Sequence, residues 1–188
     1  MFFGDKELIF DKPLIMGIIN LTPDSFSDGG KFLKKNTDRD IDKNKVQKEL
    51  EVLENNGASF IDIGAESTRP GHKTISIQQE IDRLMPVLEL ISKSNCVISI
   101  DTRKPEVMKE ALKYPVGLIN DVSALESLEA KEIIRDANIP VCVMHNRRVK
   151  SISIEADIKK FFKDKIQELT SFGISNENII LDPGFGYD

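Results

Sequence analysis

Short apolar runs alternate along this chain with longer segments in which apolar residues recur every three or four positions. The short runs are predicted strands, at Leu14–Ile19, Phe60–Ile63, Cys96–Ile100, Gly117–Ile119, Val141–Met144 and Ile179–Leu181. The longer segments are predicted helices, at Ile41–Asn56, from Ser76 onward, from Pro105 onward, at Glu126–Ala137 and at Ile154–Phe172. This repetition predicts parallel strands joined by right-handed crossovers.

Helix boundaries are visible in the sequence. Gly57 follows the first predicted helix at a typical C-terminal position, and Pro105 opens the third where no donor is lost. Ser76-Ile-Gln-Gln79 has the pattern of a capping box. The helix that it begins should bury one stripe of side chains, made of Ile77, Ile81, Leu84 and Leu88.

Two architectures fit this order of elements, an open doubly wound sheet and a (β/α)8 barrel. All six predicted strands end in polar residues, whereas an open sheet uses only the strand ends at its switch point. Strand ends that converge around an axis favour the barrel. A full barrel takes ~250 residues, so the 188 residues present should form about six of eight units, in one domain over 1–188. The first and sixth strands are then expected to be unpaired apolar edges.

Composition excludes several classes of function. The net charge of −5 provides no basic surface for nucleic acid. No apolar run approaches the ~20 residues of a membrane span, and acidic residues near the N-terminus argue against a signal peptide. Cys96 and Cys142 follow the pattern of buried thiols rather than a disulfide framework. We therefore expect a cytoplasmic protein.

The most informative segments are two polar loops that follow the first two predicted strands. The first runs Met16-Gly-Ile-Ile-Asn-Leu-Thr-Pro-Asp-Ser-Phe-Ser-Asp-Gly-Gly30, and the second runs Phe60-Ile-Asp-Ile-Gly-Ala-Glu-Ser-Thr-Arg-Pro-Gly71. Polar loops at the carboxyl ends of buried strands are where α/β barrels place their chemistry. Later strand ends continue the pattern, as Ser99-Ile-Asp-Thr102, Leu118-Ile-Asn-Asp121, Val143-Met-His-Asn146 and Leu181-Asp-Pro-Gly-Phe-Gly186.

In this order, these segments closely resemble the signature loops of the dihydropteroate synthase family. The resemblance covers nearly the whole chain. It implies a (β/α)8 barrel that condenses 6-hydroxymethyl-7,8-dihydropterin pyrophosphate with p-aminobenzoate, releasing pyrophosphate and 7,8-dihydropteroate. Such a reaction needs donors or metal for a polyanionic leaving group, and a carboxylate beside the pterin ring for the charge that develops there.

The resemblance assigns the pterin contacts to residues at strand ends. Asp101 is implied as the catalytic ring-side carboxylate, because it directly follows an apolar strand; its alternative role would be a helix cap. Asn120 offers both a donor and an acceptor to the ring. Asp182 suits the paired N–H groups of the pterin, although Asp-Pro-Gly is also a common turn. Met144 is implied as an apolar wall of the same pocket.

The reacting end of the site is implied to involve both loops. Asn20 is implied to bind Mg2+, which prefers oxygen ligands and keeps several waters. Arg69, as a second catalytic residue, and Thr68 are implied to contact the pyrophosphate or the reacting end of the pterin. The resemblance places the p-aminobenzoate pocket at Phe26, Pro70 and Phe185.

The chain departs from the family pattern after Gly186, where Tyr187-Asp188 closes the sequence. A seventh-strand Ser-Arg-Lys segment and an eighth-strand Arg-x-His segment are not present, so we expect little synthase activity from these residues alone. Two alternatives remain open: a related methyltetrahydrofolate methyltransferase, which does not need the two signature loops, and an inactive fragment of the synthase. The resemblance also implies a homodimer for a complete barrel.

Overall fold

The computed structural model describes residues 1–23, 30–34, 37, 40–67, 74–146 and 153–185. Its helices are α1 (Lys43–Asn55), α2 (Ile77–Ile91), α3 (Pro105–Ala111), α4 (Leu128–Ala137) and α5 (Ile154–Ser171), with a short 3-10 turn, η1 (Asn176–Asn178). Its strands are β1 (Phe2–Phe3), β2 (Lys6–Glu7), β3 (Ile15–Asn20), β4 (Ala58–Gly64), β5 (Val97–Asp101), β6 (Val116–Asp121), β7 (Val141–Met144) and β8 (Ile179–Asp182).

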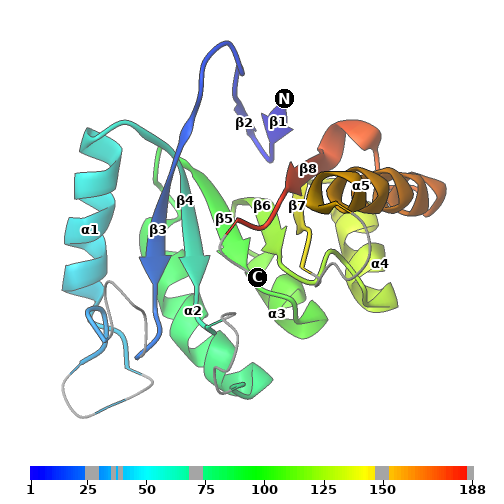
Figure 1. Ribbon diagram of the computed structural model, residues 1–188. Helices are drawn as coiled ribbons and strands as arrows, with labels where there is room; N and C mark the ends of the chain where they lie inside the picture. The colour runs from blue at the N-terminus through cyan, green and yellow to red at the C-terminus, as the bar shows by residue number, and fades with distance from the viewer. Residues whose placement is uncertain (24–29, 35–36, 38–39, 68–73, 147–152, 186–188) are drawn as a thin grey trace.

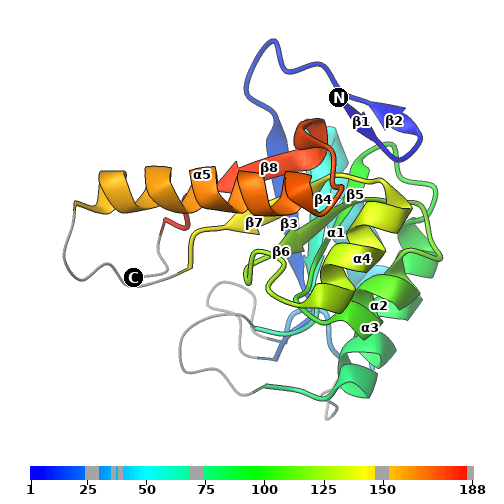
Figure 2. The same cartoon turned by 90° about the vertical axis from the view of Figure 1, so that its right-hand side faces the viewer.

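Strands β3 to β8 form one parallel sheet in which each strand pairs with the next one in the chain. Helices α1 to α4 cover one side of this sheet, and α5 packs beside β7 and β8 (Figures 1 and 2). The sequential order of the strands is that of a (β/α) barrel, as expected from the sequence. The six predicted strands are all present, with ends within two residues of the expected positions.

The core lies between the sheet and these helices, and strand alternation decides which residues enter it. On the helix side, Ile61 and Ile63 of β4 and Ile100 of β5 are fully buried. The capping box at Ser76 is confirmed, because the Ser76 and Gln79 side chains each bond the backbone of the other residue. The buried stripe predicted for this helix was wrong at Ile77, which is 37% exposed because it lies in the first turn, at the helix end.

The N-terminal hairpin of β1 and β2 was not predicted, and its strands have only two residues each. The hairpin lies at the opposite end of the sheet from the strand carboxyl ends (Figures 1 and 2). Phe3 is buried there in a small cluster with Phe60, Val97 and Leu118. Lys6 fastens the second strand by donating from Nζ to the Cys96 carbonyl at 2.9 Å. The hairpin therefore closes one end of the sheet's inner face.

Within the described part of the chain, β3 and β8 each pair with a neighbour on one side only. Apolar side chains are exposed along these edges: Ile15 is 58% exposed, Ile18 56% and Leu181 40%. The expectation of two unpaired apolar edges is confirmed. None of the described helices is long and apolar enough to cross a membrane.

Gly117 of β6 provides a test of how tightly the hairpin packs. A Cβ at this position would lie 2.7 Å from the Phe3 carbonyl oxygen and 2.9 Å from Cγ1 of Val97. We expect Gly117→Ala to lower the free energy of unfolding by about 1–3 kcal/mol, because backbone cannot move aside cheaply. Urea denaturation would measure this loss.

Gly17→Ala in β3 is the matched control. Its Cβ would meet only the end of the Leu53 side chain, at 2.9 Å, and a flexible side chain can shift. A loss for Gly117→Ala no larger than that for Gly17→Ala would contradict the tight contact with the hairpin.

Candidate active site

Four polar or small residues form one row across the carboxyl ends of the strands. Asn20 pairs with Gly64, Gly64 with Asp101, and Asp101 with Asn120, on four consecutive strands. A Cβ on Gly64 would lie 3.3 Å from Asp101 Oδ2 and 3.5 Å from Asn20 Oδ1. The absence of a side chain at Gly64 thus leaves space between these two oxygen atoms, at the edge of the sheet where α/β proteins bind ligands.

Asp101 is the most perturbed residue of this row. Burial raises its pKa well above the usual value, and the carboxylates of Asp62, Glu80, Asp121 and Glu66 raise it further. Within the described part of the chain, its Oδ1 is buried without a hydrogen-bond partner. An unpartnered buried carboxyl oxygen is costly, which points to a ligand group that completes the site.

Asp101 is not a helix cap, which was the alternative considered from the sequence. The N-cap of α3 is Lys104, three residues further on, and Pro105 follows it. Asp101 is therefore free of a capping role and ends its strand at the candidate site.

Asp62 is a buried carboxylate that the sequence reasoning did not single out. It lies two residues before the row on β4, on the same face of the sheet, opposite Ser99 on β5. Its Oδ1 accepts a hydrogen bond from Ser99 Oγ at 2.5 Å, and its Oδ2 accepts one from Asn120 Nδ2 at 3.1 Å. Burial raises its pKa, and these two hydrogen bonds offset only part of that rise. The sequence signal was available, because Asp62 interrupts the apolar run of β4 two residues before Gly64.

Asp121, next to Asn120, has a structural role. Its Oδ1 accepts hydrogen bonds from the Ser123 backbone and hydroxyl, both at 2.7 Å, and its Oδ2 accepts one from Leu125 N at 2.9 Å. These bonds hold a turn in which Ala124 and Leu125 both have a φ of 53°. Burial raises the pKa of Asp121. Both of its oxygens are occupied by the turn, so Asn120 rather than Asp121 remains for a ligand.

The last two strands bring Asp182 and Met144 opposite each other. Met144 is buried. Asp182 Oδ1 accepts a hydrogen bond from Gly184 N at 2.8 Å, so the Asp-Pro-Gly turn expected from the sequence does form. That turn engages one carboxylate oxygen of Asp182. Phe185 is 91% exposed, and its place in a p-aminobenzoate pocket stays a prediction.

His145 follows β7 but is engaged elsewhere. Its Nε2 lies 2.7 Å from Asp157 Oδ2 of α5, and both side chains are buried. The Phe161 ring packs edge-on against the imidazole. The pair links the end of β7 to the first turn of α5.

The other predicted contacts, Phe26, Thr68, Arg69 and Pro70, lie outside the described residues. Their roles stay predictions.

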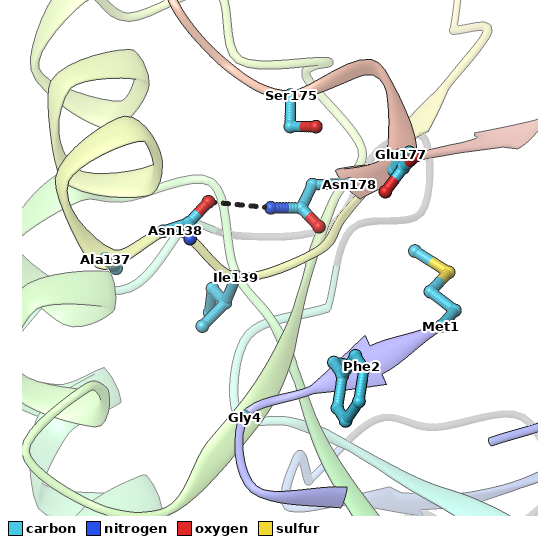
Figure 3. Close-up of a pocket in the computed structure, with 9 residues that line it drawn as sticks. All are labelled: Met1, Phe2, Gly4, Ala137, Asn138, Ile139, Ser175, Glu177 and Asn178. Carbon is cyan, nitrogen blue, oxygen red and sulfur yellow. Dashed lines mark hydrogen bonds between the residues drawn. The ribbon is translucent and has the colours of Figure 1, made fainter. Parts of the chain in front are cut away.

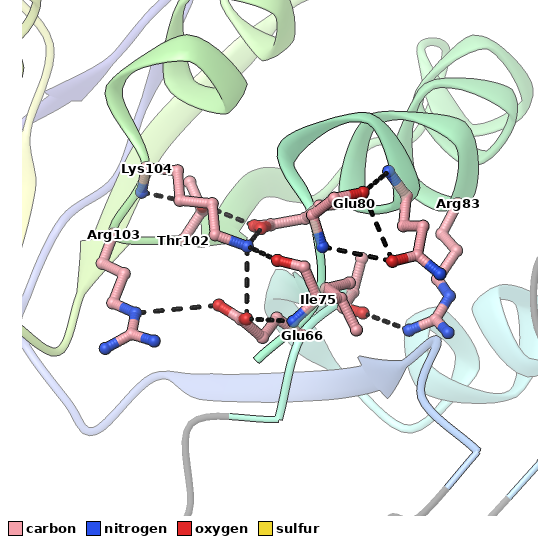
Figure 4. Close-up of polar contacts among 10 residues, drawn as sticks. Glu66, Ile75, Glu80, Arg83, Thr102, Arg103 and Lys104 are labelled. Atoms are coloured by element: carbon pink, nitrogen blue, oxygen red, sulfur yellow. Dashed lines mark hydrogen bonds and ion pairs between the residues drawn. The ribbon is translucent and has the colours of Figure 1, made fainter. Parts of the chain in front are cut away.

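An ionic cluster beside the row joins three chain segments (Figure 4). Lys104, after β5, places Nζ 2.7 Å from Glu80 of α2 and 3.2 Å from Glu66, which follows β4. Both carboxylates are almost fully buried. Thr102 donates to Glu80 at 2.6 Å, and Glu66 accepts from the Ile75 backbone at 2.9 Å. The cluster therefore fixes both ends of the segment that contains Thr68 to Pro70.

A pocket also lies at the opposite end of the sheet (Figure 3). It is formed by the start of the chain, the end of α4 and the segment around η1, with Asn178 Nδ2 donating to Asn138 Oδ1 at 3.1 Å. Glu177 is the one acidic or basic side chain in its lining. This pocket is far less suited to acid–base or phosphate chemistry than the strand ends are.

Oxygen atoms dominate the row of strand ends, which suits Mg2+. The described residues contain no group of three or more histidine, cysteine or acidic side chains placed to hold a metal ion. The residues fit a metal held by Asn20 together with ligand oxygens and water, and they do not form a closed protein cage.

Comparisons with known proteins agree with this geometry. The model of the family described as "Pterin binding enzyme" matches residues 16–188. Curated dihydropteroate synthases of Escherichia coli K12 and Clostridium beijerinckii are 37% and 39% identical to the chain, covering all of it and 67% and 68% of their own lengths.

Solved structures give the same result. The dihydropteroate synthase of Yersinia pestis, in a sulfonamide drug complex, superposes with a TM-score of 0.85 at 35% identity, over 96% of this chain and 65% of that one. The Vibrio fischeri enzyme superposes with a TM-score of 0.84 at 37% identity, over 99% of this chain and 67% of that one.

The parallel sheet, its polar strand ends and the matched family model define the class as the pterin-binding enzymes. Within this class, the chain belongs to the dihydropteroate synthase family. It spans about two thirds of the length of the relatives that it matches. The methyltransferase alternative is not supported by these relatives.

The raised pKa of Asp101 has a consequence for stability. In the unfolded chain the group ionises near pH ~4, but in the folded protein it ionises only at higher pH. Its contribution to folding is fully present below the unfolded pKa and is lost as pH rises towards the folded pKa. Asp101→Asn removes this loss, so we expect the variant to gain stability relative to the parent between pH 4 and pH 7.

Thermal unfolding of both proteins across this pH range would measure the gain. Asp5→Asn, at an exposed position of the hairpin, is the control substitution of the same chemical type. If the stability difference between Asp101→Asn and the parent stays constant with pH, the pKa of Asp101 is not raised in the folded protein.

Lys104→Met should leave Glu66 and Glu80 buried without their shared cation. Breaking a buried ion pair from one side costs about 3–5 kcal/mol, and chemical denaturation would measure the loss. Lys113→Met is the matched control, because Lys113 pairs with Glu110 at the surface and such pairs contribute about 1 kcal/mol or less. Equal losses for the two variants would show that the cluster is no stronger than a surface pair.

Proposed function

We propose that this chain carries the pterin-binding part of a dihydropteroate synthase. The reaction joins p-aminobenzoate to 6-hydroxymethyl-7,8-dihydropterin pyrophosphate. The arylamine nitrogen forms a bond to the pterin CH2 group, the C–O bond to pyrophosphate breaks with its electron pair, and the amine gives up a proton. The observation that carries the proposal is Asp101, a buried carboxyl in line with Asn20 and Asn120, one of whose oxygens has no hydrogen-bond partner among the described residues.

Asp101 is suited to stabilise positive charge on the ring. A carboxyl whose pKa is raised by burial and by neighbouring carboxylates is a stronger base than usual. Its ionised form is therefore stabilised most in the transition state, when the bond to pyrophosphate breaks and positive charge develops on the pterin. Asn120 and Asp182 would hold the polar edge of the ring, and Met144 would pack against its face.

The leaving group would be held at the other end of the row. Asn20 would supply an oxygen ligand to Mg2+, and the metal would neutralise pyrophosphate charge. Arg69 and Thr68 would contact the same group, and Glu66, fixed by Lys104, anchors the segment before them. Phe26, Pro70 and Phe185 are proposed for the p-aminobenzoate pocket.

Ligands bound to solved relatives support these substrates. One solved relative, from Burkholderia cenocepacia, is complexed with 7,8-dihydropteroate, at 32% identity and a TM-score of 0.83. Another, from Xanthomonas albilineans, contains 4-aminobenzoic acid, at 36% identity and a TM-score of 0.77.

Binding of 6-hydroxymethyl-7,8-dihydropterin to the 188-residue chain tests the proposal. We expect Asp182→Ala to weaken binding about 10-fold or more, because a charged hydrogen-bond partner of the ring is lost. Asp82→Ala, on α2, should leave the affinity unchanged. Fluorescence titration would measure both, and equal affinities for the two variants would refute the placement of the pterin.

Pyrophosphate binding should depend on Mg2+ and on Asn20. Calorimetric titration with pyrophosphate should give tighter binding with Mg2+ than with a chelator, because the described site offers an amide oxygen rather than a cation to the anion. Asn20→Ala should remove most of this difference, while the exposed Asn95→Ala should keep it. Equal affinity in both conditions would rule out the metal assignment.

A further inference from the structure

Asp62 is buried inside the sheet's inner face, below the row of site residues. Its two acceptor bonds, from Ser99 Oγ at 2.5 Å and from Asn120 Nδ2 at 3.1 Å, come from the two strands that follow β4. Both of these partners, the ones found among the described residues, are neutral. Burying a carboxylate with only neutral partners costs folding free energy, and hydrogen bonds recover only part of that cost. Asp62 is therefore poorly explained as a residue that only stabilises the core.

The contact with Asn120 has a directional consequence. An amide side chain carries donors on its nitrogen and an acceptor on its oxygen, whereas an ionised carboxylate only accepts. Asp62 therefore selects the nitrogen of Asn120, and the amide oxygen is left on the side away from Asp62. Asn120 lies beside Asp101 in the row, so this orientation is fixed next to the proposed pterin site.

We propose that Asp62 is a positioning residue for the pterin site. By accepting from Asn120 Nδ2, it holds the amide so that Oδ1 is the acceptor for a ring N–H of the pterin. Ser99, which bonds the other oxygen of Asp62, holds that carboxylate in place. This inference rests on the proposed pterin-binding function and adds to it a residue that does not itself touch the ligand.

A double-mutant cycle on the 188-residue chain tests the role. In the parent, Asp62→Asn should weaken binding of 6-hydroxymethyl-7,8-dihydropterin about 10-fold, because an Asn at position 62 can pair with either end of the Asn120 amide. In an Asn120→Ala background the same substitution should change the affinity less than twofold. Ser99→Ala, which leaves the contact with Asn120, should have a smaller effect than Asp62→Asn in the parent.

An equal loss of affinity in both backgrounds would overturn the proposal, because Asp62 would then act without Asn120. A purely structural role predicts that outcome, or a change in stability alone.

The side-chain amide signals of Asn120, measured by NMR without ligand, supply a readout that does not depend on pterin binding. We expect these protons to exchange slowly with water in the parent and in Ser99→Ala, where the hydrogen bond to Asp62 is kept, and to exchange fast in Asp62→Asn. Unchanged exchange in Asp62→Asn would overturn the positioning role. A different outcome is that exchange behaves as expected but neither the parent nor Asn120→Ala binds the pterin. That result would count against the proposed function and would still support the hydrogen bond between Asp62 and Asn120.

Discussion

Each strand from β3 to β7 pairs with the strand that follows it in the chain, and all six strands up to β8 run in the same direction. Their carboxyl ends therefore meet at one edge, and the pleat decides which residue of each strand faces inward there. The same pairing places Asn20, Gly64, Asp101 and Asn120 side by side although they are far apart in the sequence. The site follows from this pairing, since a shift of one residue in any strand would turn its side chain towards the helices.

The acidic groups gathered at one edge of the sheet repel one another and lose hydration on burial. The carboxylates there fall into two kinds. Glu66 and Glu80 share Lys104, so their charges are paired although buried. Asp101 and Asp62 lie in the same region without a described cation, and burial raises the pKa of both. The carboxylates paired with Lys104 hold the loops, Asp101 faces the proposed ligand, and Asp62 holds Asn120 beside it. This division is typical of a site kept for binding rather than for stability.

Much of the fold could be predicted because its signals are local. The strands are short apolar runs, and α2 begins at a capping box. The hairpin of β1 and β2 could not be predicted, because two-residue strands have no periodicity and gain stability only from distant contacts. At the site, Asp101 and Asn120 follow their strands visibly in the sequence. Asp62 interrupts an apolar run and could have been noticed, but its role could not be predicted, because that role comes from two hydrogen bonds across neighbouring strands.

The hairpin also affects the order in which the chain can fold. Phe3 packs against the Gly117 backbone, although about 110 residues separate the two in the sequence. Contacts across such a separation form late, because a long loop must close before they give any stability. The hairpin therefore cannot dock before β6 has been made, and until then Phe3 stays in contact with water and this end of the sheet stays open.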